Sequence, residues 1–298
     1  MTSIGTLARP RFFHLLWLLI LAAAVVPVTA QGQMTRNRAE PNAPVDEVFW
    51  APTIINTSSV TNLEKRNLNF TIMHVFGVLS NGVEDLFGLD ASANIRFGLD
   101  YGITNRLSVG AGRSRFDKLY DGRFKLNVLR QAKRRGSPIE FALKGSVGVT
   151  TLKNGFDLVD RLSYHAAVLI ARRFDDRLSI QITPMYAHFN TVFKTRDAEG
   201  NVVEEQNDHF AVAVGGRIVL SEKVALTAEY VPVFGDRSDG TVDAFGFGFD
   251  IETGGHVFQL FFTTSQWLTE QHLVARNTDD FARGGRRLGF NVNRVFSL

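Results

Sequence analysis

Apolar side chains alternate with small or polar ones along most of this chain, and that alternation limits the fold more than any other feature. In residues 91–101, every second position is Ala, Ile, Phe, Leu or Tyr, and the positions between them are Ser, Asn, Arg, Gly and Asp. Successive side chains of a β-strand point to opposite faces, so this period predicts strands with one apolar face. Twelve segments show it: 67–76, 91–101, 107–111, 124–128, 139–149, 162–170, 178–186, 210–220, 224–230, 245–251, 258–262 and 288–296.

The faces opposite the apolar ones are rich in Gly, Ala and Ser, as at Gly98, Gly110 and Ala142. A soluble β-sandwich would instead carry Lys, Glu and Thr on its solvent-facing positions, with the apolar faces meeting in a core. Small residues suit a confined interior. Apolar-out, polar-in segments of about ten residues are typical of a transmembrane barrel. We therefore predict an all-β, antiparallel outer-membrane β-barrel of about 12 strands in a single domain.

Short and long connections alternate between these segments. The shorter connections are 103–106, 131–138, 175–177, 221–223 and 252–255, and the longer ones are 77–90, 117–122, 153–160, 191–208, 234–243 and 265–285. Outer-membrane barrels have short periplasmic turns, long extracellular loops and an even strand number. The connections therefore predict the same fold independently of the alternation.

The N-terminus has the pattern of a secretory signal peptide over residues 1–30. Arg9 and Arg11 lie just before an apolar run from Phe12 to Val26. Pro27-Val28-Thr29-Ala30 then leads to Gln31. The alternative is an uncleaved anchor, although the run is short for a membrane span. The chain has no cysteine, which excludes a lipoprotein signal and disulfides. We assign residues 31–60 to a periplasmic extension, with Phe49-Trp50 as its candidate docking point, and residues 61–298 to the barrel.

The C-terminal strand resembles the signal that outer-membrane assembly machinery recognises. Residues 289–298 place Phe290, Val292, Phe296 and Leu298 on one face, with the last aromatic residue two positions before the end. Expected partners are therefore this machinery and outer-membrane lipids. A net charge of +3 does not indicate nucleic-acid binding.

Several segments carry a resemblance to a known family: 74–77 (HVFG), 88–90 (GLD), 101–114 (YGITNRLSVGAGRS), 124–131 (FKLNVLRQ), 251–262 (IETGGHVFQLFF) and 289–296 (GFNVNRVF). With these, residues 48–298 resemble a β-barrel family of Bacteroidota outer-membrane proteins, filed as a domain of unknown function. The resemblance implies the fold and the Gram-negative outer membrane. It brings no catalytic residues to carry over.

Charged residues fall on the inward-facing positions of the predicted strands. They must pair or remain hydrated, because a desolvated lone charge is too costly. Two interpretations stay open: a salt-bridged core that fills the barrel, or a narrow, slightly basic passage. Eight strands fill with side chains whereas 16 leave a channel, and twelve lies between. The candidate lumen-lining charges are Arg96, Asp100, Lys125, Glu140, Lys144, Arg173, Arg217, Glu229 and Asp250.

Other candidate residues give weaker signals. Ser163 and His165 share a strand face, as in some outer-membrane lipid hydrolases, but they point inward and lack an orienting carboxylate. His74 and His188 are expected at the membrane rim. Arg113 and Arg115 are expected at the outer leaflet, as lipid-phosphate contacts or solvated charges. No metal-ligand spacing and no phosphate-binding loop is present, so we predict no metal, no cofactor and no catalytic residue.

The sequence thus favours a non-enzymatic, porin-like barrel that passes small solutes or anchors an envelope partner. The rival is an outer-membrane lipid-modifying enzyme of hydrolase or acyltransferase type, and the third interpretation is a soluble exported β-protein.

Overall fold

The computed structural model describes residues 43–298 except 46, 154, 193 and 197–201. The predicted signal peptide and residues 31–42 of the predicted extension lie outside the described residues.

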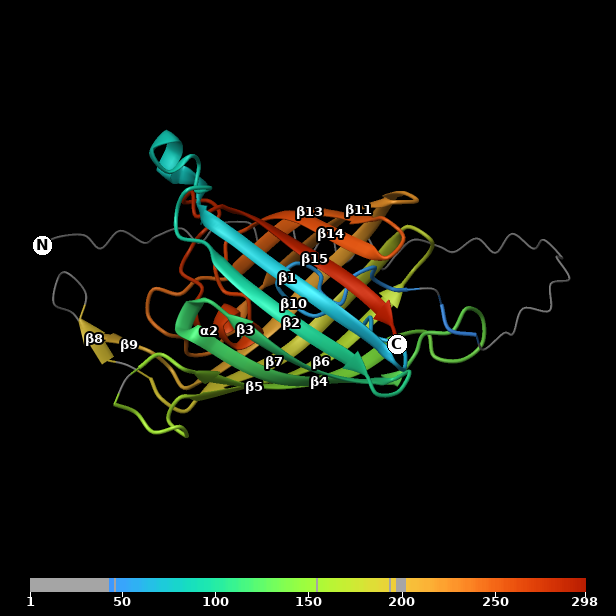
Figure 1. The fold of residues 1–298 in the computed structure, drawn as a ribbon, viewed down its shortest axis with the longest axis horizontal. Helices are drawn as coiled ribbons and strands as arrows, with labels where there is room; N and C mark the ends of the chain where they lie inside the picture. Colours follow the sequence, from blue (N-terminus) through green and yellow to red (C-terminus); the bar gives the residue numbers. More distant parts are fainter. Residues whose placement is uncertain (1–42, 46, 154, 193, 197–201) are drawn as a thin grey trace, which may run out of the picture. The chain divides into compact units, whose positions relative to one another are not determined.

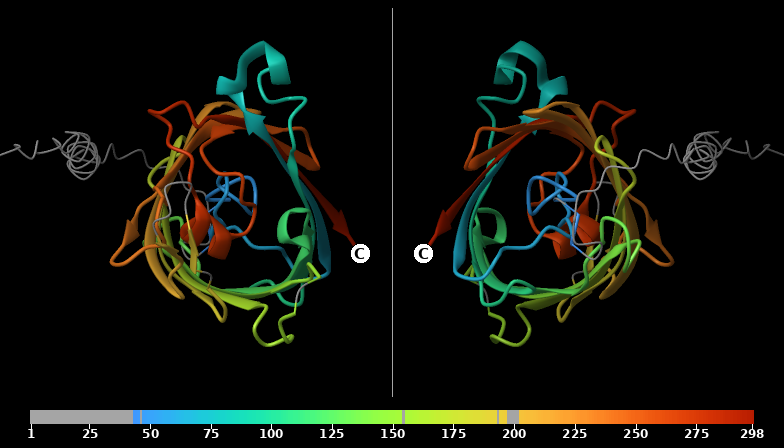
Figure 2. Two further views of the ribbon diagram at one scale, coloured as in Figure 1. Left: turned by 90° about the vertical axis from the view of Figure 1, so that its left-hand side faces the viewer. Right: turned by 90° about the vertical axis from the view of Figure 1, so that its right-hand side faces the viewer.

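Twelve antiparallel strands form a closed barrel, in which β15 pairs with β1 (Figures 1 and 2). All twelve strands predicted from the alternation are present. Their bounds are β1 (Asn67–Val78), β2 (Asn94–Gly102), β3 (Leu107–Ser114), β4 (Leu119–Leu129), β5 (Glu140–Thr150), β6 (Leu162–Arg173), β7 (Leu178–Phe189), β10 (Asp208–Ser221), β11 (Val224–Val231), β13 (Ala244–Glu252), β14 (His256–Thr263) and β15 (Arg287–Ser297).

Three short strands lie in the longer loops or extend the barrel. β8 (Lys194–Arg196) and β9 (Val202–Glu204) pair with each other in the loop between β7 and β10. β12 (Val233–Phe234) follows β11 after Pro232 and pairs with the start of β10. The short connections between strands lie at one end of the barrel, called here the short-turn end. The long loops lie at the other end, called the long-loop end.

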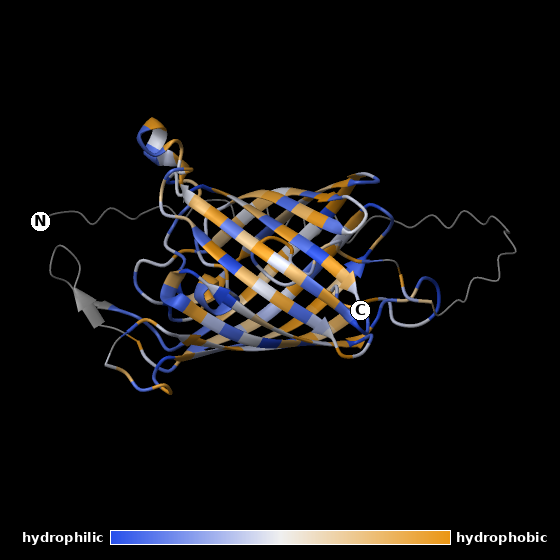
Figure 3. Cartoon of the chain, viewed as in Figure 1, coloured by the Kyte–Doolittle hydropathy of each residue, from blue (hydrophilic) through white to orange (hydrophobic). Residues whose placement is uncertain are grey.

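The alternation predicted from the sequence divides the wall into two faces (Figure 3). β2 lies between β1 and β3. Its residues Phe97 and Leu99 are 48% and 50% exposed on the outer face, whereas Arg96 on the inner face is 6% exposed. Apolar side chains that stay exposed on a closed wall are stable only where lipid replaces water. The outer face is therefore built for a bilayer.

β4 begins at Leu119, although residues 117–122 were expected to form a loop. The earlier start pairs Gly112 with Asp121 and Gly110 with Arg123. These glycines make room for the charges, because a Cβ on Gly112 would lie 2.2 Å from Arg96 Nη2 and a Cβ on Gly110 would lie 2.0 Å from Asp100 Oδ1. The additional strand residues at the start of β4 place Asp121 and Arg123 inside the barrel.

The helical elements of the described residues are short: η1 (Leu79–Asp85), η2 (Phe116–Lys118) and α2 (Glu270–Arg276). Among the described residues, no helix has the length and apolar character needed to cross a membrane. α2 belongs to the β14–β15 loop, yet it lies inside the ring of strands and packs against β6, β7 and β10 (Figure 2).

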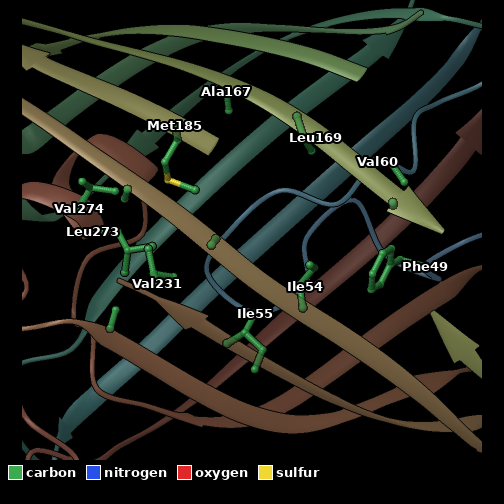
Figure 4. Close-up of a cluster of buried hydrophobic side chains, with 14 of the residues drawn as sticks. Phe49, Ile54, Ile55, Val60, Ala167, Leu169, Met185, Val231, Leu273 and Val274 are labelled. Carbon is green, nitrogen blue, oxygen red and sulfur yellow. The ribbon is translucent and has the colours of Figure 1, made fainter. Parts of the chain in front are cut away.

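A second segment also occupies the lumen. Residues 47–62, called here the plug segment, lie within the barrel (Figure 2), and Val48, Phe49, Ile54, Ile55 and Val60 are each no more than 2% exposed. They form an apolar core with small wall residues and with Leu273 and Val274 of α2 (Figure 4). Residues up to 60 were expected to form an extension outside the barrel. They lie inside it instead, because their apolar side chains pack in this core and their backbone is bound by polar side chains of the wall.

Candidate functional site in the lumen

The plug segment enters and leaves the barrel at the same end. Just before it, the Val45 N–H donates to Gln131 O in the β4–β5 turn at 2.8 Å. Just after it, the Arg66 N–H donates to Gly102 O at the end of β2, also at 2.8 Å. At its tip, Thr53 and Ser58 pair across a tight turn, closed by the Ile54 N–H bonding Thr57 O at 2.8 Å. The plug is therefore a re-entrant loop from the short-turn end.

Glu229 on β11 binds the tip of the plug. Its carboxylate accepts the backbone N–H groups of Ile55 at 3.3 Å, Asn56 at 2.7 Å and Thr57 at 3.2 Å, and the Thr57 hydroxyl at 2.9 Å. Glu229 is 2% exposed. A buried carboxylate is stable where several donors converge on it, so the charge and the turn require each other.

Gln259 on β14 binds the carbonyl oxygens of the same turn. Its Nε2 donates to Ile54 O at 2.8 Å and Thr53 O at 3.1 Å, and its Oε1 accepts from the Thr53 hydroxyl at 2.8 Å. Gln259 Nε2 also donates to Asp250 at 2.9 Å, and Asn291 on β15 donates to both Ile55 O and Gln259 Oε1. The wall thus binds the plug backbone as it would bind a peptide ligand.

The returning arm of the plug is held from the opposite wall. Gln181 on β7 accepts the Val60 N–H at 2.8 Å and donates to Ser58 O at 2.7 Å. Asn127 on β4 donates to Val60 O at 3.0 Å, and Lys125 donates to the carbonyl oxygens of Ser59 and Thr61. The buried backbone groups of this irregular segment are satisfied by side chains in place of a strand partner.

The apolar side of the plug fits against gaps in the wall. A Cβ on Gly215 of β10 would lie 2.5 Å from Ile54 Cδ1, and a Cβ on Gly246 of β13 would lie 3.2 Å from Ile55. Arg217, 2% exposed, lies with its guanidinium carbon 5.0 Å from the Trp50 ring centre and donates to Glu47 O at 3.3 Å. Phe49-Trp50 was expected as a docking point. Both rings contact Arg217 on the inner wall of the barrel.

α2 closes the lumen from the long-loop end. Glu270 accepts the Ser58 N–H at 2.8 Å and forms an ion pair with Lys144 of β5. Burial would raise the pKa of this carboxyl, but the charges of Lys144 and His165 and the hydrogen bonds lower it well below its usual range. Glu270 therefore joins α2, the plug tip and the wall as an ionised group.

A second cluster fixes α2 to the loops. Arg276 Nη1 bonds Asp117 Oδ2 at 3.0 Å, Arg276 Nη2 lies 3.3 Å from Glu205, and His272 Nε2 lies 3.5 Å from Asp117. Burial lowers the pKa of His272. Burial acts to raise the pKa of Asp117, but the contacts with His272 and Arg276 lower it overall. His272 also stacks on Trp267, with ring centres 5.1 Å apart.

A ladder of ion pairs lines the wall where the plug does not touch it. Arg96 Nη2 bonds Asp121 at 2.7 Å, Arg123 bonds Asp121 at 2.8 Å, and Arg123 forms a two-pronged bond with Asp100 at 2.8 Å. Asp121 and Arg123 were missed from the sequence because β4 was expected to begin later. Their even spacing from Lys125 gives them the same inward parity, and that spacing was the available signal.

Between this ladder and the plug lies a cavity of about 80 Å³. Its charged lining consists of Arg96, Arg123, Lys125 and Lys144 with Asp100, Asp121 and Glu270. The volume is enough for a few water molecules. Beside it, the plug segment and α2 occupy the lumen (Figure 2).

The nine charges predicted to line the lumen divide between these environments. Lys125, Lys144, Arg217 and Glu229 contact the plug or α2, and Arg96 and Asp100 belong to the ladder. Asp250 bonds Gln259, and Glu140 accepts from Asn127 at 2.7 Å. Arg173 lies at the short-turn end, 3.0 Å from Asp176.

The other candidates lie apart from the plug tip, and one of them has a carboxylate nearby that the sequence did not indicate: His165 Nδ1 lies 3.7 Å from Glu270 Oε2. Ser163 and His165 are both buried inside the barrel, and neither the Ser163 hydroxyl nor either His165 ring nitrogen has a hydrogen-bond partner. His74 stacks on Phe290 at 5.0 Å, and His188 lies 2.8 Å from Asp208. Arg113 is exposed over the Tyr120 ring, and Arg115 bonds Ser92 at 2.9 Å. Within the part of the chain that is described, no three His, Asp or Glu side chains gather as a metal site.

Comparisons with known proteins agree with this architecture. A crystal structure of an outer membrane channel from Pseudomonas putida F1 is similar with a TM-score of 0.50 and 11% identity, covering 79% of this chain and 97% of that one. The NanC porin gives a TM-score of 0.46 and 9% identity, covering 78% of this chain and 99% of that one. The likeness to the Pseudomonas putida channel concerns the fold alone. A search of curated proteins gave no match.

The family model for the membrane-bound beta barrel domain DUF5777 matches residues 49–296, and so includes nearly all of the plug segment with the twelve strands. The chain belongs to this family of membrane-bound β-barrels.

Proposed function

We propose that this protein is a porin-like, non-enzymatic channel of the outer membrane, held closed by its own plug segment and by α2. The observation that carries the proposal is that a separate stretch of chain lies inside the lumen and is held there by hydrogen bonds to the wall. Both ends of that stretch lie at the short-turn end, so it can withdraw there without threading the barrel.

The proposed orientation places the short-turn end in the periplasm and the long-loop end outside, as in other outer-membrane barrels. Export through a cleaved signal peptide over residues 1–30 and assembly through β15 belong to the same proposal. The passage would follow the wall formed by β1–β5, where the cavity already lies. Its lining of four cationic and three anionic side chains favours small anions slightly over cations.

Liposome swelling tests this function. Vesicles holding the wild-type protein should admit glycerol slowly and a monosaccharide hardly at all. Vesicles holding Glu229→Ala should admit both, because the tip of the plug loses its acceptor, and should still exclude a large oligosaccharide. A folded Glu229→Ala barrel that admits no more solute than wild type would refute the channel and favour the anchor role.

A further inference from the structure

A basic groove lies at the short-turn end, beside the point where the chain enters the barrel. It is formed by two neighbouring turns, the β4–β5 turn (residues 130–139) and the β6–β7 turn (residues 174–177), and has a volume of about 520 Å³. Lys133 and Arg134 line it from the first turn, and Arg172 and Arg173 line it beside the second. Arg130 and Arg135 are exposed in or beside the first turn, and Arg177 in the second.

Hydrogen bonds between the first turn and the end of β6 hold this groove in shape before a ligand binds. Gln131, 6% exposed, donates from Nε2 to Arg173 O at 2.8 Å and accepts the Arg173 N–H on Oε1 at 2.8 Å. Within the first turn, the Ala132 N–H donates to Ser137 O at 2.9 Å. A ligand would therefore meet a surface that needs little ordering.

The acidic residues of the groove are already engaged. Asp175 Oδ1 accepts the N–H groups of Arg177 at 2.7 Å and Leu178 at 2.8 Å, and Asp176 pairs with Arg173 at 3.0 Å. Arg172 and Arg134 are both exposed and face the same groove. The lining of the groove thus carries four cationic side chains against two anionic ones.

The groove also borders the apolar belt of the barrel. Arg172 follows the outward-facing positions of β6, and its guanidinium carbon lies 5.1 Å from the ring centre of Phe174, which is 46% exposed. On the other side, Leu129 at the end of β4 is 47% exposed. Cations directly beside exposed apolar side chains are arranged as the interface of a bilayer requires, with headgroups next to acyl chains.

We propose that this groove binds the phosphate headgroup of an anionic phospholipid, with the guanidinium groups of Arg134 and Arg172 on the phosphate and the acyl chains along Leu129 and Phe174. Arginine suits this role because its planar donor fork matches phosphate oxygens. The assignment to the periplasmic leaflet rests on the orientation proposed above, whereas the headgroup chemistry does not.

Native mass spectrometry of the whole protein tests the proposal. The protein, in detergent micelles, is mixed with phosphatidylglycerol or with phosphatidylcholine of equal chain length, and the retained lipid is counted. The wild type should retain phosphatidylglycerol preferentially. The double variant Arg134→Ser/Arg172→Ser should bind it at least about ten-fold more weakly, as expected for the loss of one charge-assisted hydrogen bond or more.

The matched control is Lys65→Ser/Lys223→Ser, which removes two exposed cations of the same end away from the groove. It should retain phosphatidylglycerol as the wild type does. Equal retention of the two lipids by wild-type protein would overturn the proposal without any variant, and so would an equal loss in the control. Displacement by the same concentration of inorganic phosphate would show a site for a soluble anion and would also overturn it. These results are independent of whether the lumen conducts.

Discussion

The two sides of the lumen are built differently. Along β6 to β14 the plug packs against alanines and glycines, and Ile54 fills the space over Gly215. Along β1 to β5 the wall carries the ion-pair ladder and the cavity. The plug thus packs its apolar side chains on one side, and on the other it is held only by polar side chains of β4 and β5 beside the charged cavity. Widening the passage therefore requires the plug to leave its packed side.

The largest effect is expected from removing the carboxylate that holds the plug tip. Glu229→Ala leaves three backbone N–H groups without an acceptor, which should cost about 3–5 kcal/mol of plug docking. Denaturant titration of Trp50 fluorescence, in a Trp267→Phe background, measures this. The exposed Glu222→Ala should change docking by less than about 0.5 kcal/mol. A similar value for both variants would contradict the binding role of Glu229.

On the packed side, an added side chain should also loosen the plug. Gly215→Val forces atoms into the space of Ile54 and should cost about 1–3 kcal/mol. The control is its neighbour Gly216→Val, whose Cβ would meet nothing closer than Ser179 O at 3.4 Å. The same titration compares the two. Equal stability of these variants would mean that Ile54 does not fill this gap.

The docking of α2 should weaken in mild acid. The pKa of His272 is lowered by burial, so the undocked state binds more protons as the pH falls below about 6.5, and docking is lost in that window. The pKa values of Glu270 and Asp117 are lowered too, so these groups remain ionised there. Trp267 fluorescence, in a Trp50→Phe background, should report an effect of about 1 kcal/mol between pH 7 and pH 5.

His272 Nδ1 lies 2.9 Å from the Thr269 hydroxyl, so His272→Gln should reduce this pH dependence while keeping a polar side chain at that contact. If the variant titrates as the wild type does, another group controls the docking of α2.

The smallest effect is expected on the cavity side. Ser146 lines the cavity, so Ser146→Leu has space for its larger side chain and should change stability by less than about 1 kcal/mol. Thermal unfolding followed on a heat-modifiability gel measures it against Gly215→Val. A loss as large as that of Gly215→Val would erase the difference between the two sides.

The barrel could be predicted from the sequence because each strand faces lipid on one side and a confined interior on the other, and this imposes a period of two. The plug could not. Its residues show no period, and their partners are remote: Asn56 bonds Glu229 from 173 positions away. The charge of Glu229 indicated an inward group, but nothing local indicated that it would bind a backbone turn.

The ion-pair ladder was predicted in part. Arg96 and Asp100 follow from the regular alternation of β2. Asp121 and Arg123 precede the apolar run of β4, so they were not predicted as strand residues. α2 was hidden because seven residues within a long loop carry too little periodicity to indicate a helix buried in the lumen.

Single-channel conductance in a planar bilayer tests the central claim, that the plug segment closes this barrel, most directly. The wild type should remain near the baseline, with rare and small openings, and Glu229→Ala should give steady steps several-fold larger with a slight preference for anions. Large, steady steps from the wild type, unchanged in Glu229→Ala, would show that the lumen is open with the plug in place and that the plug does not close it.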